Sequence, residues 1–213
     1  MSEGSRQLRL VVATANPGKA REMREILGAE LGCRIELVAR PHDLSAVREE
    51  GETLEDNARL KAAAVRRATG LGVVADDTGL EVDALGGNPG VRAARYAGPD
   101  ERPADNIAKL LDELGEREDR HARFRTVALA VLPDGRELVA SGTLEGTIAR
   151  SPRGTGGFGY DSVFVPDGAG DRTLAEMSSG AKHAISHRGR ALRALARQIE
   201  ECLSGTAPVP DGI

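Results

Sequence analysis

The stretch over residues 71–79 places the strongest constraint on how this chain folds. An apolar run at 71–75 is followed directly by Asp76-Asp77-Thr78-Gly79. The apolar run predicts a short buried strand, and the polar residues are typical of a turn where a strand ends. Two adjacent carboxylates beside a low-dielectric wall need a compensating cation, and Mg²⁺ prefers such oxygen ligands. These residues alone leave two interpretations open, a metal site or a solvated acidic turn.

The first structural unit of the chain is a predicted strand, loop and helix. Residues 8–14 form an apolar run, residues 16–19 carry turn signals, and apolar residues then recur on one helical face as far as Leu31. Lys19 therefore lies at a helix N-terminus, where free N–H groups and the helix dipole attract anions. This loop is not a P-loop, because Ala13 replaces the first glycine of that motif and Ala20 follows the lysine. A solvated surface lysine is the alternative.

A second strand at 34–39 and a polar loop at 40–52 precede a helix that carries two candidate polar residues. Thr53 is expected to cap this helix, with Asp56 at the capping-box position and Gly70 as its stop. Asn57 and Lys61 are four residues apart and share a face. A lone lysine on a helix is otherwise a surface residue.

The remaining chain changes from strand–helix units to a hairpin. A short strand is predicted at 80–85, a helix from about 103 to 114, and two strands at 124–132 and 136–149 joined by Pro133-Asp134-Gly135. Such a hairpin beside strand–helix units predicts a mixed sheet. A final helix is expected from about Arg190.

Two later segments offer contacts for a ligand. The loop at 153–161 matches G-x-G-x-x-G, but residues 160–165 are predicted to continue as strand, so it does not fit a dinucleotide fold. Phe158 lies among its glycines and could stack on a base; an exposed Phe in a mobile loop is the alternative. His183 and His187 are four apart without the glutamate of a zinc motif, so zinc is not expected.

Composition bounds the class of protein. The 213 residues suit one α/β domain, which we place at 8–203 between a flexible N-terminus at 1–7 and a disordered tail at 204–213. A net charge of −4 argues against nucleic-acid binding, and no run reaches the roughly 18 apolar residues of a membrane span. The two cysteines lack metal or redox spacing, which favours free thiols in the cytoplasm.

The candidate residues together suit a metal-bound nucleoside triphosphate: carboxylates for Mg²⁺, lysines for phosphate, Phe158 for the base and His/Arg donors for its edge. The chain resembles the inosine triphosphate pyrophosphatase family, the XTP/dITP diphosphatases. The resemblance lies in six ordered stretches between about residues 8 and 200, namely residues 13–19, 53–57 with Lys61, 75–80, 85–90 with 94–96, 154–161 and 186–189.

The resemblance implies hydrolysis of ITP, dITP and XTP to the monophosphate and pyrophosphate, with Mg²⁺ as cofactor. It also implies a homodimer and an elongated mixed β-sheet flanked by helices, with an active cleft between two lobes. By position it assigns Asp77 as proton acceptor and magnesium ligand, and Lys19 and Lys61 as further catalytic residues. The substrate-binding residues that it implies are Thr14, Ala15, Asn16, Pro17, Gly18, Lys19, Thr78, Phe158, Gly159, Tyr160, Asp161, Lys182, His187 and Arg188.

One metal ligand departs from the family pattern. Members often carry a glutamate three residues before the glycine of the 49–52 loop, where this chain has Arg48, so either Glu49 or Glu50 is the expected replacement. Asp76 is expected as a second metal ligand or an electrostatic support. It should matter less than Asp77, because adjacent strand residues point to opposite sides.

The mechanism expected from these residues is attack of a water on the α-phosphorus, with Asp77 orienting or deprotonating it and Lys61 near that phosphate. Donors from Lys182, His187 or Arg188 suit a 6-oxo purine and disfavour the amino group of adenine. Two alternatives remain: a related pyrophosphatase for pyrimidine or methylated nucleotides, and a nucleotide-binding module without catalysis.

Overall fold

The structure is a computed structural model that describes residues 7–99 and 102–205, so the expected ends at 1–7 and 204–213 lie almost entirely outside it. In this part of the chain, seven strands form one sheet in the order β2-β1-β3-β5-β6-β7, with β4 paired to β3. The strands are β1 (Leu8–Val12), β2 (Ile35–Ala39), β3 (Gly72–Val82), β4 (Pro89–Gly90), β5 (His121–Val131), β6 (Glu137–Ile148) and β7 (Phe164–Pro166). The α-helices are α1 (Pro17–Leu31), α2 (Leu54–Thr69), α3 (Pro103–Leu114), α4 (Ser179–Ile185) and α5 (His187–Leu203).

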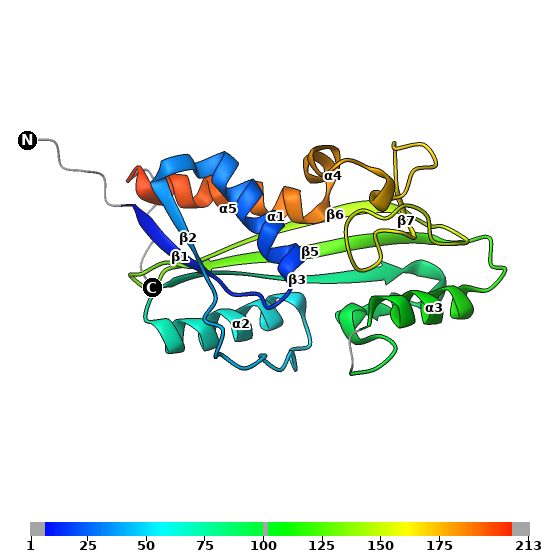
Figure 1. Cartoon of the computed structure of the whole chain (residues 1–213), viewed down its shortest axis with the longest axis horizontal. Helices are drawn as coiled ribbons and strands as arrows, with labels where there is room; N and C mark the ends of the chain where they lie inside the picture. Colours follow the sequence, from blue (N-terminus) through cyan, green and yellow to red (C-terminus); the bar gives the residue numbers. More distant parts are fainter. Residues whose placement is uncertain (1–6, 100–101, 206–213) are drawn as a thin grey trace, which may run out of the picture.

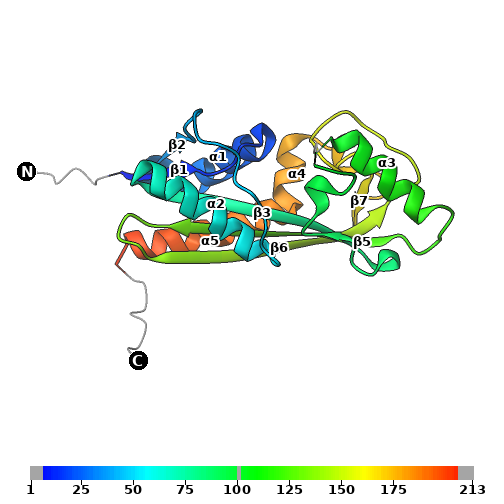
Figure 2. The same ribbon diagram turned by 90° about the horizontal axis from the view of Figure 1, so that it is seen from below.

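The sheet is mixed and elongated, as expected, and helices cover both of its faces (Figure 1). The strands β1, β2 and β3 are parallel, whereas β3, β5, β6 and β7 are antiparallel neighbours. The helices α1 and α5 lie on one face and α2 on the other (Figures 1 and 2). The α3 helix packs at the far end of the sheet in a separate apolar cluster with β7, through Leu110 and Phe164. Within the described residues, no helix combines the length and the apolar character that crossing a membrane requires.

The middle of β3 has a strand on one side only. β1 pairs with β3 as far as Val12 and Val74, and β4 pairs with β3 from Leu80. Between these points, β5 is the one strand among the described residues that pairs with β3. In open α/β sheets, ligands bind beside the carboxyl ends of strands at such a change of direction. The register therefore opens a site next to residues 75–79.

The predicted turn at 76–79 is wrong. The predicted strands at 71–75 and 80–85 merge into the single strand β3, which ends at Val82, and Asp83–Leu85 forms a 3-10 helix instead of strand. Asp76 and Asp77 lie in the interior of β3. Each of these residues pairs in register with β5, Asp76 with Ala128 and Asp77 with Val127. Pairing along the whole strand outweighs the turn preference of Asp, Thr and Gly, because β-propensity depends on tertiary context.

Two other predicted boundaries also differ from the structure. Residues 160–163 form turns, and only Phe164–Pro166 pairs with β6. The last helix begins at His187 rather than Arg190, because Ser186 caps it by accepting from the backbone N–H of Gly189. The capping box of Thr53 and Asp56 is confirmed, as is the left-handed Gly70 that ends α2 (φ 67°).

Candidate active site

Two adjoining cavities lie beside the middle of β3. One, the polar cavity, encloses about 450 Å³ and is lined by charged side chains that include Lys19, Lys61 and Asp77. The other, the aromatic cavity, encloses about 160 Å³ and is lined by Phe124, Phe158 and Tyr160 among others. Both cavities are lined by Asn16, Lys19, Thr78 and Ala94. A molecule with an anionic part and a flat apolar part could therefore occupy both.

Asp77 is the buried acid of the polar cavity and is held by α2. Its Oδ1 accepts from Lys61 Nζ at 2.7 Å, and its Oδ2 accepts from Asn57 Nδ2 at 3.1 Å. The sequence placed Asn57 and Lys61 on one helical face, and the structure directs that face at Asp77. Burial lowers the pKa of Lys61, but Asp77, Asp76 and Glu49 outweigh burial and hold this pKa above its usual value. Lys61 is therefore a permanent cation beside Asp77.

Lys19 stands at the start of α1, beyond the end of β1. Asn16 caps this helix, and its Oδ1 accepts from the backbone N–H of Lys19 at 3.1 Å. Lys19 Nζ lies 3.7 Å from Asp76 Oδ2 and 4.0 Å from Asp77 Oδ1, so it reaches carboxylates on both faces of β3. Burial and the cation of Lys61 lower the pKa of Lys19, against the opposing effect of Asp76. Lys19 and the free backbone N–H groups at the start of α1 together form a site that attracts anions.

The structure separates the two candidate glutamates. Glu49 lines the polar cavity and bridges two cations: its Oε1 accepts from Lys61 Nζ at 3.1 Å, and its Oε2 lies 3.6 Å from Arg95 Nη1. Arg95 also donates to the backbone oxygen of Glu49 at 2.6 Å. Glu50 also lines the polar cavity, but it is exposed and its ion-pair partner is Arg48, at 3.8 Å. Glu49 is therefore the glutamate that is joined to Asp77, through Lys61.

Asp76 lies on the opposite face and lines neither cavity. Its Oδ2 accepts from Arg188 Nε at 2.9 Å. Burial opposes the charge of Asp76, but Lys19, Arg188 and Lys61 outweigh it and hold its pKa well below the usual value. Among residues 7–99 and 102–205, Oδ1 of Asp76 is the one buried side-chain polar atom without a hydrogen-bond partner. Asp76 thus supplies negative charge between Lys19 and Arg188.

A buried ion network surrounds the predicted base-contacting residues. Lys182 Nζ donates to Asp161 at 2.6 Å and to Glu22 at 2.7 Å, and Arg188 Nη1 donates to Glu22 at 2.6 Å. Lys182 lines neither cavity, whereas Arg188 and Asp161 line the aromatic one. The sequence analysis missed Glu22, although it lies four residues before the buried Ile26 on the inward face of α1.

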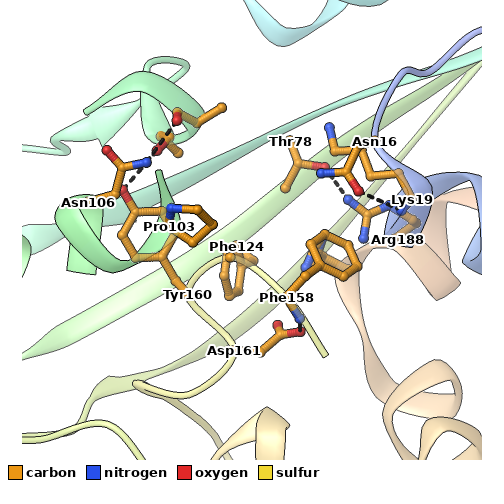
Figure 3. A pocket seen from close by; sticks show the side chains of 14 residues that line it. Asn16, Lys19, Thr78, Pro103, Asn106, Phe124, Phe158, Tyr160, Asp161 and Arg188 are labelled. Carbon is orange, nitrogen blue, oxygen red and sulfur yellow. Dashed lines mark hydrogen bonds between the residues drawn. The ribbon is translucent and has the colours of Figure 1, made fainter. Parts of the chain in front are cut away.

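Phe158 is not the free loop residue that a mobile glycine loop would present. It is half-buried, with Lys182 Nζ 4.7 Å and Arg188 Cζ 5.4 Å from its ring centroid. A Cβ built at Gly18 would lie 2.5 Å from Cδ1 of Phe158, so the ring rests on the start of α1. Asp161 accepts from the backbone N–H of Phe158 at 2.8 Å and holds the loop in this position (Figure 3).

His187 and Tyr160 complete the aromatic cavity. The imidazole of His187 stacks on Phe124 with ring centroids 4.5 Å apart, and its Nδ1 lies 2.6 Å from Thr126 Oγ1. Burial, together with Arg188 and Lys182, lowers the pKa of His187 well below its usual value. Tyr160 is anchored through its hydroxyl to the backbone oxygen of Ala93 at 2.8 Å. Phe124 and Thr126 carried no sequence signal beyond strand periodicity.

The other expected residues of the loop after β1 are also accounted for. Thr14 and Ala15 line the polar cavity, whereas Pro17 and Gly18 line neither cavity and form the first turn of α1. Gly159 lines the aromatic cavity. In the part of the chain that the structure describes, no group of three His, Cys, Asp or Glu side chains could hold a metal ion.

Comparisons with known proteins agree over most of the chain. A sequence model of the Ham1 family matches residues 10–198. A Streptomyces coelicolor protein named dITP/XTP pyrophosphatase is 47% identical over 200 residues, which are 92% of this chain and 98% of that protein. A Streptococcus agalactiae protein of the same name is 46% identical over 189 residues; the match takes in 87% of this chain but spans only 58% of that relative. The solved structure of a HAM1 protein from Coxiella burnetii superposes with a TM-score of 0.80 at 38% identity, over 92% of this chain and 100% of that one.

Proposed function

The chain belongs to the Ham1 family, and from this membership we propose that it hydrolyses non-standard purine nucleoside triphosphates. The products would be the nucleoside monophosphate and pyrophosphate, and the substrates would be ITP, dITP and XTP. Relatives named dITP/XTP pyrophosphatase support this substrate class. Such an activity would remove these nucleotides before their incorporation into DNA or RNA.

The observation that carries the proposal is the junction of the two cavities at Lys19 and Thr78. A triphosphate would lie in the polar cavity against Lys19, Lys61 and the start of α1. The purine would lie in the aromatic cavity beside Phe158 and His187. The α-phosphate would then fall near the junction, within reach of the Asp77 side of β3.

Asp77 is the proposed proton acceptor. Because Lys61 and Asn57 fix both of its oxygens, the carboxylate can orient a water and take its proton without reorganising. The water oxygen bonds to the α-phosphorus as the bond to the bridging oxygen breaks, and pyrophosphate leaves. Lys61 and Lys19 stabilise the negative charge that shifts onto the leaving phosphates.

Mg²⁺ is the proposed cofactor, and the residues present suit it. Magnesium is usually held by one or two carboxylates together with water and substrate phosphates, rather than by a cage of protein ligands. Asp77 and Glu49 provide such a pair of carboxylates. The ammonium group of Lys61 donates to both of them, which brings the two carboxylates to the same place. When bound, Mg²⁺ would neutralise phosphate charge and polarise the α-phosphate. Asp76 acts from the other face as electrostatic support.

The assembly and location of the protein belong to the same proposal. A homodimer is proposed from the family resemblance, and a cytoplasmic site of action is proposed from the cysteines. The free Cys33 and Cys202 suit a reducing compartment. The net charge of −4 supports a small-molecule substrate over nucleic acid.

A panel of triphosphates tests the activity. Pyrophosphate release should be measured from ITP, XTP, GTP, ATP and dTTP, each with and without Mg²⁺. We expect fast Mg²⁺-dependent release from ITP and XTP and slow release from ATP and dTTP. A preference for dTTP or another pyrimidine would contradict the purine assignment, and binding without any turnover would leave only a nucleotide-binding module.

A further inference from the structure

A directed chain of hydrogen bonds connects Arg188 to His187 through two hydroxyls. Arg188 Nη2 donates to Thr78 Oγ1 at 3.0 Å (Figure 3), Thr78 Oγ1 lies 2.7 Å from Thr126 Oγ1, and Thr126 Oγ1 lies 2.6 Å from His187 Nδ1. Thr78 and Thr126 are directly opposite in the register of β3 and β5. Thr126 is fully buried and belongs to none of the residue sets assigned above to catalysis or binding.

The direction of this chain follows from proton counting. A guanidinium only donates, so Thr78 accepts from Arg188 and must place its single proton elsewhere. Among the described residues, its possible acceptors are Thr126 Oγ1 at 2.7 Å and Asp76 Oδ2 at 3.5 Å. O–H···O bonds normally span about 2.5–3.0 Å, so the proton goes to Thr126. Thr126 then donates its own proton to His187 Nδ1.

Because Nδ1 of His187 accepts a hydrogen bond, the single proton of a neutral imidazole must lie on Nε2. His187 is buried beside Arg188 and Lys182, which disfavours a second proton. Its N–H is therefore at Nε2, and the stacked ring of Phe124 fixes the ring plane. In the described residues, Nε2 has no protein hydrogen-bond partner and is not among the buried orphan atoms, so it opens to the aromatic cavity that His187 lines.

The other cations near this cavity are already engaged. Lys182 donates to Glu22 and Asp161. Arg188 donates through Nε, Nη1 and Nη2 to Asp76, Glu22 and Thr78. Lys19, which also lines this cavity, faces the carboxylates of Asp76 and Asp77 at 3.7 and 4.0 Å. The N–H of His187 is thus a donor that the protein network leaves for a ligand on the aromatic side.

We propose that Thr126 is a positioning residue for purine selection: its hydroxyl fixes His187 as the tautomer whose Nε2–H donates to the 6-oxo group of the base. This rests on the proposed function, because it assigns the choice between 6-oxo and 6-amino purines to the base side of that site. A 6-amino group would meet a donor with a donor, which leaves both without a partner.

The first test compares Thr126→Val with Thr126→Ser. Valine keeps the shape of threonine without its hydroxyl, and serine keeps the hydroxyl. We expect Thr126→Val to lower the ratio of kcat/KM for ITP to that for ATP by about tenfold, since Nδ1 loses its fixed donor. Thr126→Ser should keep this ratio within about twofold of the wild type. A purely structural role would lower both rates together and leave the ratio unchanged, which would overturn the proposal.

The second test reads the tautomer in the wild-type protein and uses a variant only to assign its signals. The imidazole ¹⁵N chemical shifts of the wild-type protein report the tautomer directly, and the loss of one signal set in His187→Gln identifies His187 among the four histidines. We expect a protonated Nε2 and an unprotonated Nδ1. The Nδ1–H tautomer would overturn the proposal even if ITP is hydrolysed. If the wild type shows the expected Nε2–H tautomer but releases no pyrophosphate from ITP, the proposed function fails and the tautomer assignment stands.

Discussion

Asp76 and Asp77 are consecutive in β3, yet their carboxylates are held by helices on opposite faces of the sheet. Arg188 of α5 donates to Asp76, and Lys61 of α2 donates to Asp77. The strand alternation that separates them also gives them different surroundings, because only Asp77 lines a cavity. Lys19 reaches both carboxylates from beyond the end of β1 and joins the two sides.

Asp77→Asn should abolish most turnover without loss of the fold, because Lys61 keeps Glu49 as an ionic partner at 3.1 Å. The amide keeps an oxygen for Lys61 but cannot take a proton from water, so kcat for pyrophosphate release from ITP should fall by roughly 10²–10⁴-fold. Steady-state kinetics with ITP measure the effect, and circular dichroism checks the fold. Turnover equal to that of the wild type would remove Asp77 from its proposed role.

Asp76→Asn should instead destabilise the protein. Removing one partner from a buried ion pair leaves Arg188 and Lys19 under-compensated, at a cost of about 3 kcal/mol in the free energy of unfolding at pH 7. Urea unfolding measures this difference. The control is Asp112→Asn on the exposed side of α3, which should change stability by less than about 0.5 kcal/mol.

The effect of Asp76 should depend on pH in a defined window. The pKa of Asp76 is lower in the folded protein than the roughly 3.9 of an unfolded aspartate, so the unfolded chain binds the proton more readily. The stabilisation is complete above about pH 5 and is lost as the pH falls through the folded-state pKa. The difference between wild type and Asp76→Asn should therefore shrink between pH 5 and pH 3. A constant difference over this range would contradict the ion-pair origin.

Gly18→Ala should weaken substrate binding by moving Phe158. The new methyl would lie 2.5 Å from Cδ1 of the ring, and the side chain, unlike the backbone of α1, is able to move. We expect KM for ITP to rise several-fold with little change in thermal stability. Gly28→Ala on the same helix is the matched control, because a Cβ there meets nothing within 4 Å. That substitution should leave KM unchanged and stabilise the protein by about 0.5–1 kcal/mol.

Arg95→Gln should raise the apparent KM of the enzyme for the Mg²⁺–ITP complex. Arg95 donates to the backbone oxygen of Glu49 at 2.6 Å and lies 3.6 Å from the carboxylate of Glu49. Loss of the Arg95 side chain therefore frees the loop that carries Glu49, the proposed Mg²⁺ ligand. A lost charged hydrogen bond predicts an increase of about tenfold in the apparent KM for the Mg²⁺–ITP complex. Arg92→Gln, three residues away on an exposed site, should have no effect. Equal effects of the two variants would exclude the loop-anchoring role.

Local sequence patterns predicted most of the elements that carry the site. The cap at Thr53, the stop at Gly70 and the spacing of Asn57 and Lys61 act over a few residues, and each appears in the structure as its pattern indicates. The family resemblance, carried by ordered motifs, named the residues that we propose bind phosphate and named Asp77 as the proposed proton acceptor. These are properties of short segments, in which the relevant contacts lie within one or two turns of helix.

Only the tertiary structure decided which side chains meet across the sheet. The sequence placed a turn at Asp76-Asp77, because the preference of Asp, Thr and Gly for turns is local, whereas the pairing of β3 with β5 depends on a strand about fifty residues away. It gave no sign of Glu22 between Lys182 and Arg188, since that contact spans 160 residues or more. The sequence also did not indicate the hydrogen bond from Thr126 to His187, which fixes the position of the proton on the imidazole. Residue types and local spacing thus determined what chemistry the chain contains, and the register of β3 and β5 with the packing of α1, α2 and α5 decided which charges face each other.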